Sequence, residues 1–146
     1  MARWRQIFKI VGPISFFLIV FFILAYKAVD DGWLIPHTPL SLKGEPAVLF
    51  FNRHKGCACA LAVYRAAAGQ VQDWTVAERQ GVQLVSIDLD RRPDLGAQYD
   101  VIRAPALLLA DRAGEIVYRQ DEVVSDTEPL NLPWFESKFA EVLNGK

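Results

Sequence analysis

The sequence lacks internal repeats and low-complexity tracts, and it contains only two cysteines among its 146 residues. Without repeats, the chain has room for one ordinary domain and an appendage, because domains usually contain about 100 to 200 residues. With only two cysteines, any thiol chemistry must take place at Cys57 and Cys59.

The chain also lacks an excess of positive charge beyond its first 27 residues. Four of its 16 Lys and Arg lie before residue 28, which leaves 12 against all 17 Asp and Glu, a formal charge of −5. Proteins that bind nucleic acids or anionic lipid through charge are basic. We therefore expect no nucleic-acid partner for the folded part of the chain.

Charge is absent altogether from the run between Ile10 and Tyr26, which is rich in Phe, Ile, Leu and Val. A transmembrane helix needs about 20 mostly apolar residues, and extending the run to residue 7 supplies them. No polar face interrupts the run, which argues against a buried core helix. A cleaved secretory signal is the rival interpretation, but the small residues Ala25 and Ala28 lack the alternate spacing that cleavage favours. We predict a transmembrane anchor over residues 7–26.

The charges that flank this run predict its orientation. Arg3, Arg5 and Lys9 precede it, whereas Asp30 and Asp31 follow it closely. Because positive residues remain on the cytoplasmic side, we expect a single-pass protein of the cytoplasmic (inner) membrane with its N-terminus in the cytoplasm. The rest of the chain would then be extracytoplasmic.

We divide the chain into three parts on this basis. Residues 1–27 form a cytoplasmic stub and the anchor. Residues 28–46 contain three prolines and two glycines without a sustained period, and we interpret them as an extracytoplasmic linker. Residues 47–146 form the folded domain.

Strand-like and helix-like patterns alternate in the domain, which indicates an α/β layer fold. The first helix should carry Cys59, Ala62, Val63 and Ala66 on one face, and Gly69 should end or kink it before a second helical piece that stops at Gly81. In the order β-α-β-α-β-β-α, we predict strands over 47–51, 82–90, 106–110 and 115–120 and helices that begin at residues 58, 93 and 133.

From Ala47 to about Leu143 the chain resembles the thioredoxin family. The resemblance is carried by AVLFF before the two cysteines, by VSIDLD, and by YDVIRAPALLLADRAGEIV. It implies a thioredoxin-like fold in which Pro105, preceded by Ala104, is a cis-proline that faces the cysteines. Without the resemblance, Pro105 could be an ordinary trans proline at the start of a strand.

The chain departs from the family's usual active site in three ways. Only one residue separates the cysteines, no tryptophan precedes the first of them, and the strand that leads to the site lacks the buried acidic residue often found there. The family's activity therefore cannot be transferred directly to this chain.

A disulfide between Cys57 and Cys59 requires that Cys57 lie in the loop before the helix and Cys59 in its first turn. We expect such a small ring to be strained, which favours an oxidising or isomerising couple. Arg53, His54 and Lys55, together with the helix N-terminus, should support a thiolate. We expect Cys57 to be the exposed, attacking sulfur and Cys59 the buried, resolving one.

Three functions fit these residues. The preferred one is an enzyme, a thiol–disulfide oxidoreductase or isomerase that acts without a cofactor on thiols or disulfides of exported proteins. The second is Cu(I) binding and delivery, with His54, Cys57 and Cys59 as the alternative metal ligands. The third is a redox-silent scaffold that binds a partner through the loop at residues 120–134. A purely structural disulfide is a further possibility, but so short a loop would stabilise the fold little. The sequence leaves the oligomeric state open.

Overall fold

The computed structural model describes the backbone of residues 2–31, 38–42 and 44–144, with side chains in the first range from residue 14 onward. The chain divides after residue 36 into two units. The side chains of residues 7–13, in the predicted anchor, lie outside the described part. So do residues 32–37 and 43 of the predicted linker.

The first unit is one long helix, α1 (Ala2–Asp30), which runs through the predicted anchor. An ion pair between Lys27 Nζ and Asp31 Oδ2, 3.4 Å apart, lies at its C-terminal end. Most of its described side chains are apolar and exposed, among them Phe17 and Phe22. Within the part of the chain that the structure describes, no helix is long and apolar enough to cross a membrane.

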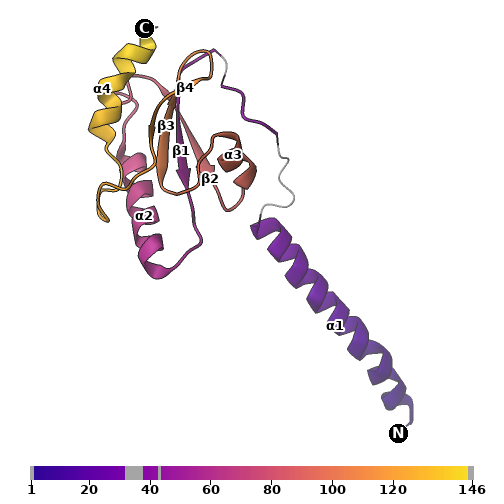
Figure 1. Ribbon diagram of the computed structural model, residues 1–146. Helices are drawn as coiled ribbons and strands as arrows, with labels where there is room; N and C mark the ends of the chain where they lie inside the picture. The colour runs from indigo at the N-terminus through magenta and orange to yellow at the C-terminus, as the bar shows by residue number, and fades with distance from the viewer. Residues whose placement is uncertain (1, 32–37, 43, 145–146) are drawn as a thin grey trace. The chain divides into compact units, whose positions relative to one another are not determined.

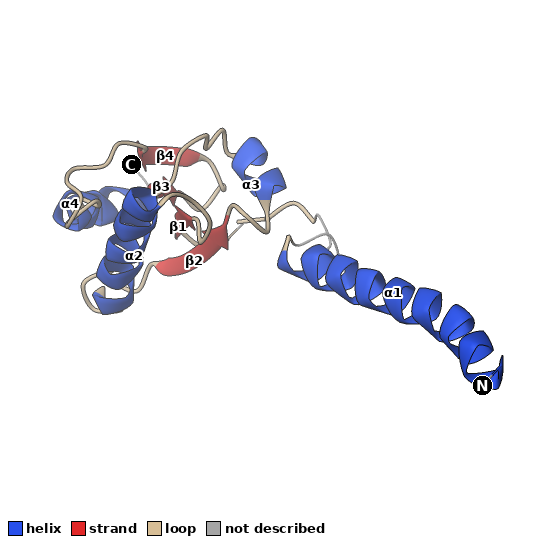
Figure 2. Ribbon diagram, turned by 90° about the horizontal axis from the view of Figure 1, so that it is seen from below, coloured by secondary structure: helices blue, strands red, loops and turns tan. Residues whose placement is uncertain are grey.

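The second unit is built on a four-stranded sheet in the order β2-β1-β3-β4. Its strands are β1 (Ala47–Asn52), β2 (Gln83–Asp88), β3 (Ala106–Ala110) and β4 (Ile116–Gln120). The helices are α2 (Ala58–Asp73), α3 (Pro93–Gln98) and α4 (Leu132–Leu143). Figures 1 and 2 show α2 and α4 on one face of the sheet and α3 on the other. The predicted α/β architecture and order of elements are confirmed.

Strand β1 lies at the centre of the sheet, which explains its continuous apolar run. It pairs with β2 in parallel and with β3 antiparallel, and β3 pairs antiparallel with β4 as the short connection predicts. Val48 and Phe50 face the core beneath α2 and α4, whereas Leu49 and Phe51 face the core beneath α3. Since both faces are covered, each of these side chains is at most 4% exposed.

Helix α2 differs from the prediction because Gly69 neither ends nor kinks it; the helix continues to Asp73. A glycine inside a helix costs only about 1 kcal/mol relative to alanine. Tertiary contacts offset that cost, because Val71 is buried and the Gln70 amide exchanges two hydrogen bonds with the backbone of Leu130.

The prediction of a second helical piece after Gly69 is also wrong. Residues 76–81 form turns instead. Thr75 and Glu78 hydrogen-bond each other's backbone N–H groups at the start of the turns, and Gly81 follows with a positive φ of 80°. This local capping closes the chain into a turn before β2 begins.

Residues 38–42, which we assigned to the linker, contact the folded domain. Leu40 and Leu42 pack against the core beneath α3. Gln98 and Tyr99 both donate hydrogen bonds to the carbonyl of Leu40, and Arg92 donates one to the carbonyl of Thr38. This part of the predicted linker is therefore a docked segment and not a free tether.

Replacing Phe139 by alanine should lower the free energy of unfolding by about 3–5 kcal/mol, the usual cost of deleting a buried aromatic ring. Phe139 is fully buried in α4, and its ring stacks on that of Trp74 with centroids 5.6 Å apart. Urea denaturation of the full-length protein measures the change. The control Val117→Ala, at a 43% exposed position of β4, should change stability by less than about 0.5 kcal/mol. Equal losses in both variants would contradict this assignment of the core.

Candidate functional site

The two cysteines lie at the N-terminus of α2. Cys57 is the N-cap residue with extended backbone angles (φ −70°, ψ 163°), and Cys59 is the second residue of the helix. This is the arrangement that the sequence required for a bridge. Both cysteines are free and exposed, and their Sγ atoms lie 2.7 Å apart. The two sulfurs are therefore in direct contact.

The expectation that Cys59 is buried is wrong. The buried face of α2 is carried by Ala67 and Val71 and continues to Trp74, one residue out of phase with the face that we predicted from Cys59. Ala62, assigned to the predicted face, is exposed. Because the sequence of this helix is rich in alanine, the pattern does not show which of its faces is buried. In the structure Cys59 lies on the exposed face.

The two thiols differ in their acidity. The pKa of Cys57 is lowered, chiefly by a hydrogen bond from the Cys59 thiol and then by the backbone N–H of Ala60 at the start of α2. The pKa of Cys59 is raised, because its proton is shared with Cys57 and because it faces the charge on Cys57. Cys57 is therefore the sulfur that ionises first, and Cys59 holds the remaining proton.

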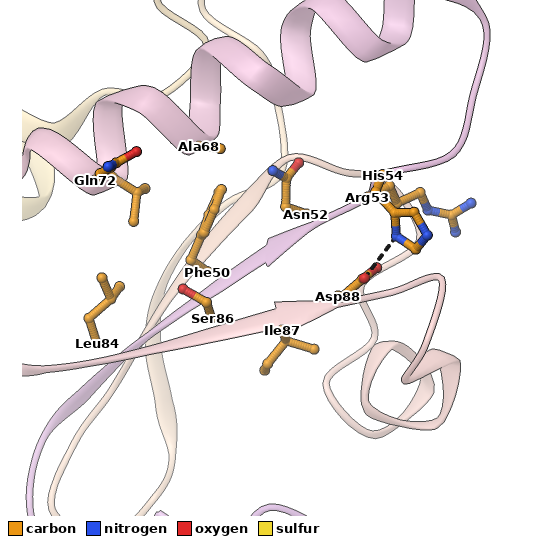
Figure 3. Close-up of a pocket in the computed structure, with 11 residues that line it drawn as sticks. Phe50, Asn52, Arg53, His54, Ala68, Gln72, Leu84, Ser86, Ile87 and Asp88 are labelled. Carbon is orange, nitrogen blue, oxygen red and sulfur yellow. Dashed lines mark ion pairs between the residues drawn. The ribbon is translucent and has the colours of Figure 1, made fainter. Parts of the chain in front are cut away.

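Arg53 and His54, which precede Cys57, are paired with carboxylates at and just after the end of β2. Figure 3 marks the ion pair between His54 and Asp88 with a dashed line. His54 Nδ1 lies 2.8 Å from Asp88 Oδ2 and 3.4 Å from Asp90 Oδ2. Arg53 Nη1 lies 4.0 Å from Asp90 Oδ1. Neither residue is among the groups that lower the pKa of Cys57. The groups that lower it are the Cys59 thiol and backbone N–H groups at the start of α2.

Asp90 also holds the backbone of the loop. One of its oxygens, Oδ2, accepts hydrogen bonds from the N–H groups of His54 (2.9 Å) and Lys55 (2.8 Å). Sequence reasoning missed both Asp88 and Asp90. The signal was available in the D-x-D pattern at the end of a buried strand, because the carboxyl ends of parallel strands meet at one edge of a sheet, where sites form.

The alternative metal site is not assembled among the described residues. One group of possible ligands comes together, namely His54, Asp88 and Asp90, with ligand atoms within 4.8 Å of one another. Its atoms already pair internally, since Asp88 accepts from His54 and from the Asp90 N–H while Asp90 accepts two loop N–H groups. His54 is thus directed into this network instead of joining Cys57 and Cys59.

Pro105 follows a cis peptide bond with Ala104, as the resemblance implied. Pro105 is fully buried and comes directly before β3. The first residue of β3, Ala106, pairs with Phe51 near the end of β1, so Pro105 and the cysteine loop lie at the same end of the sheet.

A cavity of about 430 Å³ opens beside the loop, between α2 and the strands β1 and β2. Figure 3 shows Arg53, His54 and Asp88 at one end of it and Leu84 and Gln72 towards the other. The wall is therefore polar next to the cysteine loop and more apolar further along the sheet.

The strand order β2-β1-β3-β4 and the element order from β1 onward are those of a thioredoxin-like fold. Two exposed thiols whose sulfurs are in contact can take part in thiol–disulfide exchange.

Solved thioredoxin structures are similar to this chain at low sequence identity. The thioredoxin of Fasciola hepatica is 20% identical over 69% of this chain and 84% of its own, with a TM-score of 0.49. Oxidised mitochondrial thioredoxin 3 of Saccharomyces cerevisiae is 17% identical over 68% and 82%, with a TM-score of 0.44. No protein-family model and no curated protein matches the chain.

The contact between the sulfurs predicts opposite effects of removing either one. Cys59→Ala removes the thiol that donates to Cys57, so the pKa of Cys57 should rise; Cys57→Ala should lower the pKa of Cys59 towards that of an ordinary thiol. The pH dependence of iodoacetamide alkylation, followed by mass spectrometry, measures both. An unchanged Cys57 profile in Cys59→Ala would show that the sulfurs titrate independently.

Proposed function

We propose that the protein is a membrane-anchored, extracytoplasmic thiol–disulfide oxidoreductase or isomerase that acts on exported proteins through Cys57 and Cys59. The observation that carries the proposal is the exposed dithiol at the N-terminus of α2, with sulfurs 2.7 Å apart and of unequal acidity. A pair that is in contact, accessible and polarised in this way has what thiol–disulfide exchange requires.

The reaction proceeds in two exchanges. The Cys57 thiolate attacks one sulfur of a substrate disulfide, forming a mixed disulfide and releasing the other substrate sulfur as a thiolate. Cys59 then loses its proton and attacks the Cys57 sulfur, which releases the second substrate thiolate and leaves a Cys57–Cys59 disulfide. Two electrons pass from the dithiol to the substrate, and the reverse sequence oxidises a substrate dithiol. Isomerisation uses the first exchange and its reversal at a different substrate sulfur.

Exposure of both sulfurs favours a protein substrate. Neither thiol lies in an enclosed pocket, so the disulfide of a bulky polypeptide can reach Cys57 directly. The exchange needs no cofactor, because the electrons reside in the sulfurs themselves.

The proposed location depends on the N-terminal segment. Ile10 to Tyr26 carries no charge, and the basic residues precede it. Extended to residue 7, the run has about the 20 mostly apolar residues that a spanning helix needs. The orientation follows from the excess of Arg and Lys before the run.

Substrate trapping tests the proposed chemistry. Cys59→Ser lacks the resolving sulfur and should accumulate mixed disulfides on Cys57 in the cells that produce the protein. Cys57→Ser should accumulate few, because it lacks the sulfur that ionises first, and the remaining Cys59 would be an ordinary thiol that is mostly protonated at neutral pH. Non-reducing electrophoresis and mass spectrometry of the captured species give the measurement.

The double variant Cys57→Ser/Cys59→Ser serves as the control for non-covalent capture. Trapping by neither single variant would refute the oxidoreductase proposal. Equal recovery of one partner by the double variant and the wild type would instead support the scaffold function.

Charges placed in the middle of α1 test the anchor. Ile19→Asp together with Phe22→Lys should move the protein from the membrane pellet to the supernatant after alkaline extraction, since each charge costs about 2.5–3.5 kcal/mol at the centre of a spanning helix. Val29→Asp, near the end of α1, is the control and should stay in the pellet. Retention of the double variant would argue against a spanning anchor. In intact cells, labelling of Cys57 by a membrane-impermeant maleimide tests the predicted orientation.

A further inference from the structure

The loop between β1 and α2 holds Cys57 in place, and one carboxylate fixes this loop. The sheet pairing of β1 ends at Asn52, and α2 begins after Cys57. Between them, the N–H groups of His54 and Lys55 both donate to Asp90 Oδ2, at 2.9 and 2.8 Å. These two bonds tie the middle of the loop to the segment that follows β2.

Asp90 is itself held firmly relative to the end of β1. Its N–H donates to Asp88 Oδ1 at 2.9 Å, and Asp88 is the last residue of β2, paired with Asn52 of β1. The neighbouring Leu89 N–H donates to the carbonyl of Asn52 at 2.9 Å. The Asp90 side chain is only 10% exposed, so little water competes for its oxygens.

We infer that Asp90 is a positioning residue for the dithiol: through the N–H groups of His54 and Lys55, its carboxylate fixes the loop that presents Cys57 at the N-cap of α2. The inference deepens the proposed function and rests on it for its significance. Without these two bonds the backbone of the loop loses its hydrogen bonds to Asp90, and Cys57 can move away from the position where Cys59 and the Ala60 N–H meet its sulfur.

A positioning role and a charge role predict opposite effects on Cys57. A carboxylate near a thiol disfavours the thiolate, so removing its negative charge alone would lower the pKa of Cys57. Loss of position has the opposite sign, because Cys57 would lose the hydrogen bonds that stabilise its thiolate. The direction of the change therefore distinguishes the two roles.

Three variants of the full-length protein make the test. Asp90→Ala removes both acceptor and charge, whereas Asp90→Asn removes the charge but keeps an oxygen that can accept the two N–H groups. Asp111→Ala is the matched control: Asp111 Oδ1 accepts the N–H groups of Ala113 and Glu115, both at 2.9 Å. That turn follows Ala110, which pairs with Ala47 at the opposite end of β1 from the cysteines.

The readouts are the pH profile of Cys57 alkylation and amide hydrogen exchange at His54 and Lys55. Asp90→Ala should raise the pKa of Cys57, slow its alkylation at pH 7 at least about threefold because the rate follows the thiolate fraction, and speed exchange at both amides. Asp90→Asn should not raise the pKa of Cys57, because the loop keeps an oxygen acceptor, and Asp111→Ala should leave the Cys57 profile close to that of the wild type.

A lowered pKa of Cys57 in both Asp90 variants would assign Asp90 a charge role and overturn the inference, as would an unchanged profile in Asp90→Ala. Circular dichroism checks that each variant folds. If Asp90→Ala unfolds, amide exchange in Asp90→Asn replaces it as the test. Faster exchange at His54 and Lys55 alone in Asp90→Asn would then refute the claim that an oxygen acceptor is enough to hold the loop. Alkylation and exchange require no substrate. Failure of the oxidoreductase proposal in the trapping experiment is therefore distinguishable from failure of this inference.

Discussion

The pairing of β1 on both of its edges is the constraint on which the rest of the structure depends. Because β1 is parallel to β2 and antiparallel to β3, the end of β1, the end of β2 and the start of β3 meet at one edge of the sheet. The cysteine loop follows the first, Asp88 ends the second and Pro105 precedes the third. Three segments that are distant in sequence are thus brought to one edge of the sheet.

Sequence reasoning predicted most of the sheet and less of the helices. Strand β3 has the predicted bounds, and the cis bond before Pro105 is confirmed. A continuous apolar run between turn residues indicates a strand that is buried on both faces, and such a strand lies inside the sheet. In α2, by contrast, small alanines on every side conceal the buried face, so the phase was one residue off and Cys59 was placed inside.

The remaining differences arise from tertiary contacts that have no local signal. The docking of residues 38–42 depends on the amide of Gln98 and the hydroxyl of Tyr99, which are far away in sequence. The same reason explains the different roles of Arg53 and His54. Their positions near Cys57 in the sequence predict that they support its thiolate, but in the structure they pair with Asp88 and Asp90 at the end of the neighbouring strand β2. At this site the thiolate of Cys57 is stabilised by hydrogen bonds from the Cys59 thiol and from the backbone at the start of α2.

The wholly apolar interior of β1 has a consequence for proton movement. Among the residues that the structure describes, no polar or charged side chain is buried, so the core contains no internal proton acceptor for the dithiol. In the proposed reaction, the proton that leaves Cys59 during resolution can pass to water at the protein surface, because Cys59 is exposed. Such a couple exchanges protons with its compartment, so the acidity of that compartment enters its redox equilibrium.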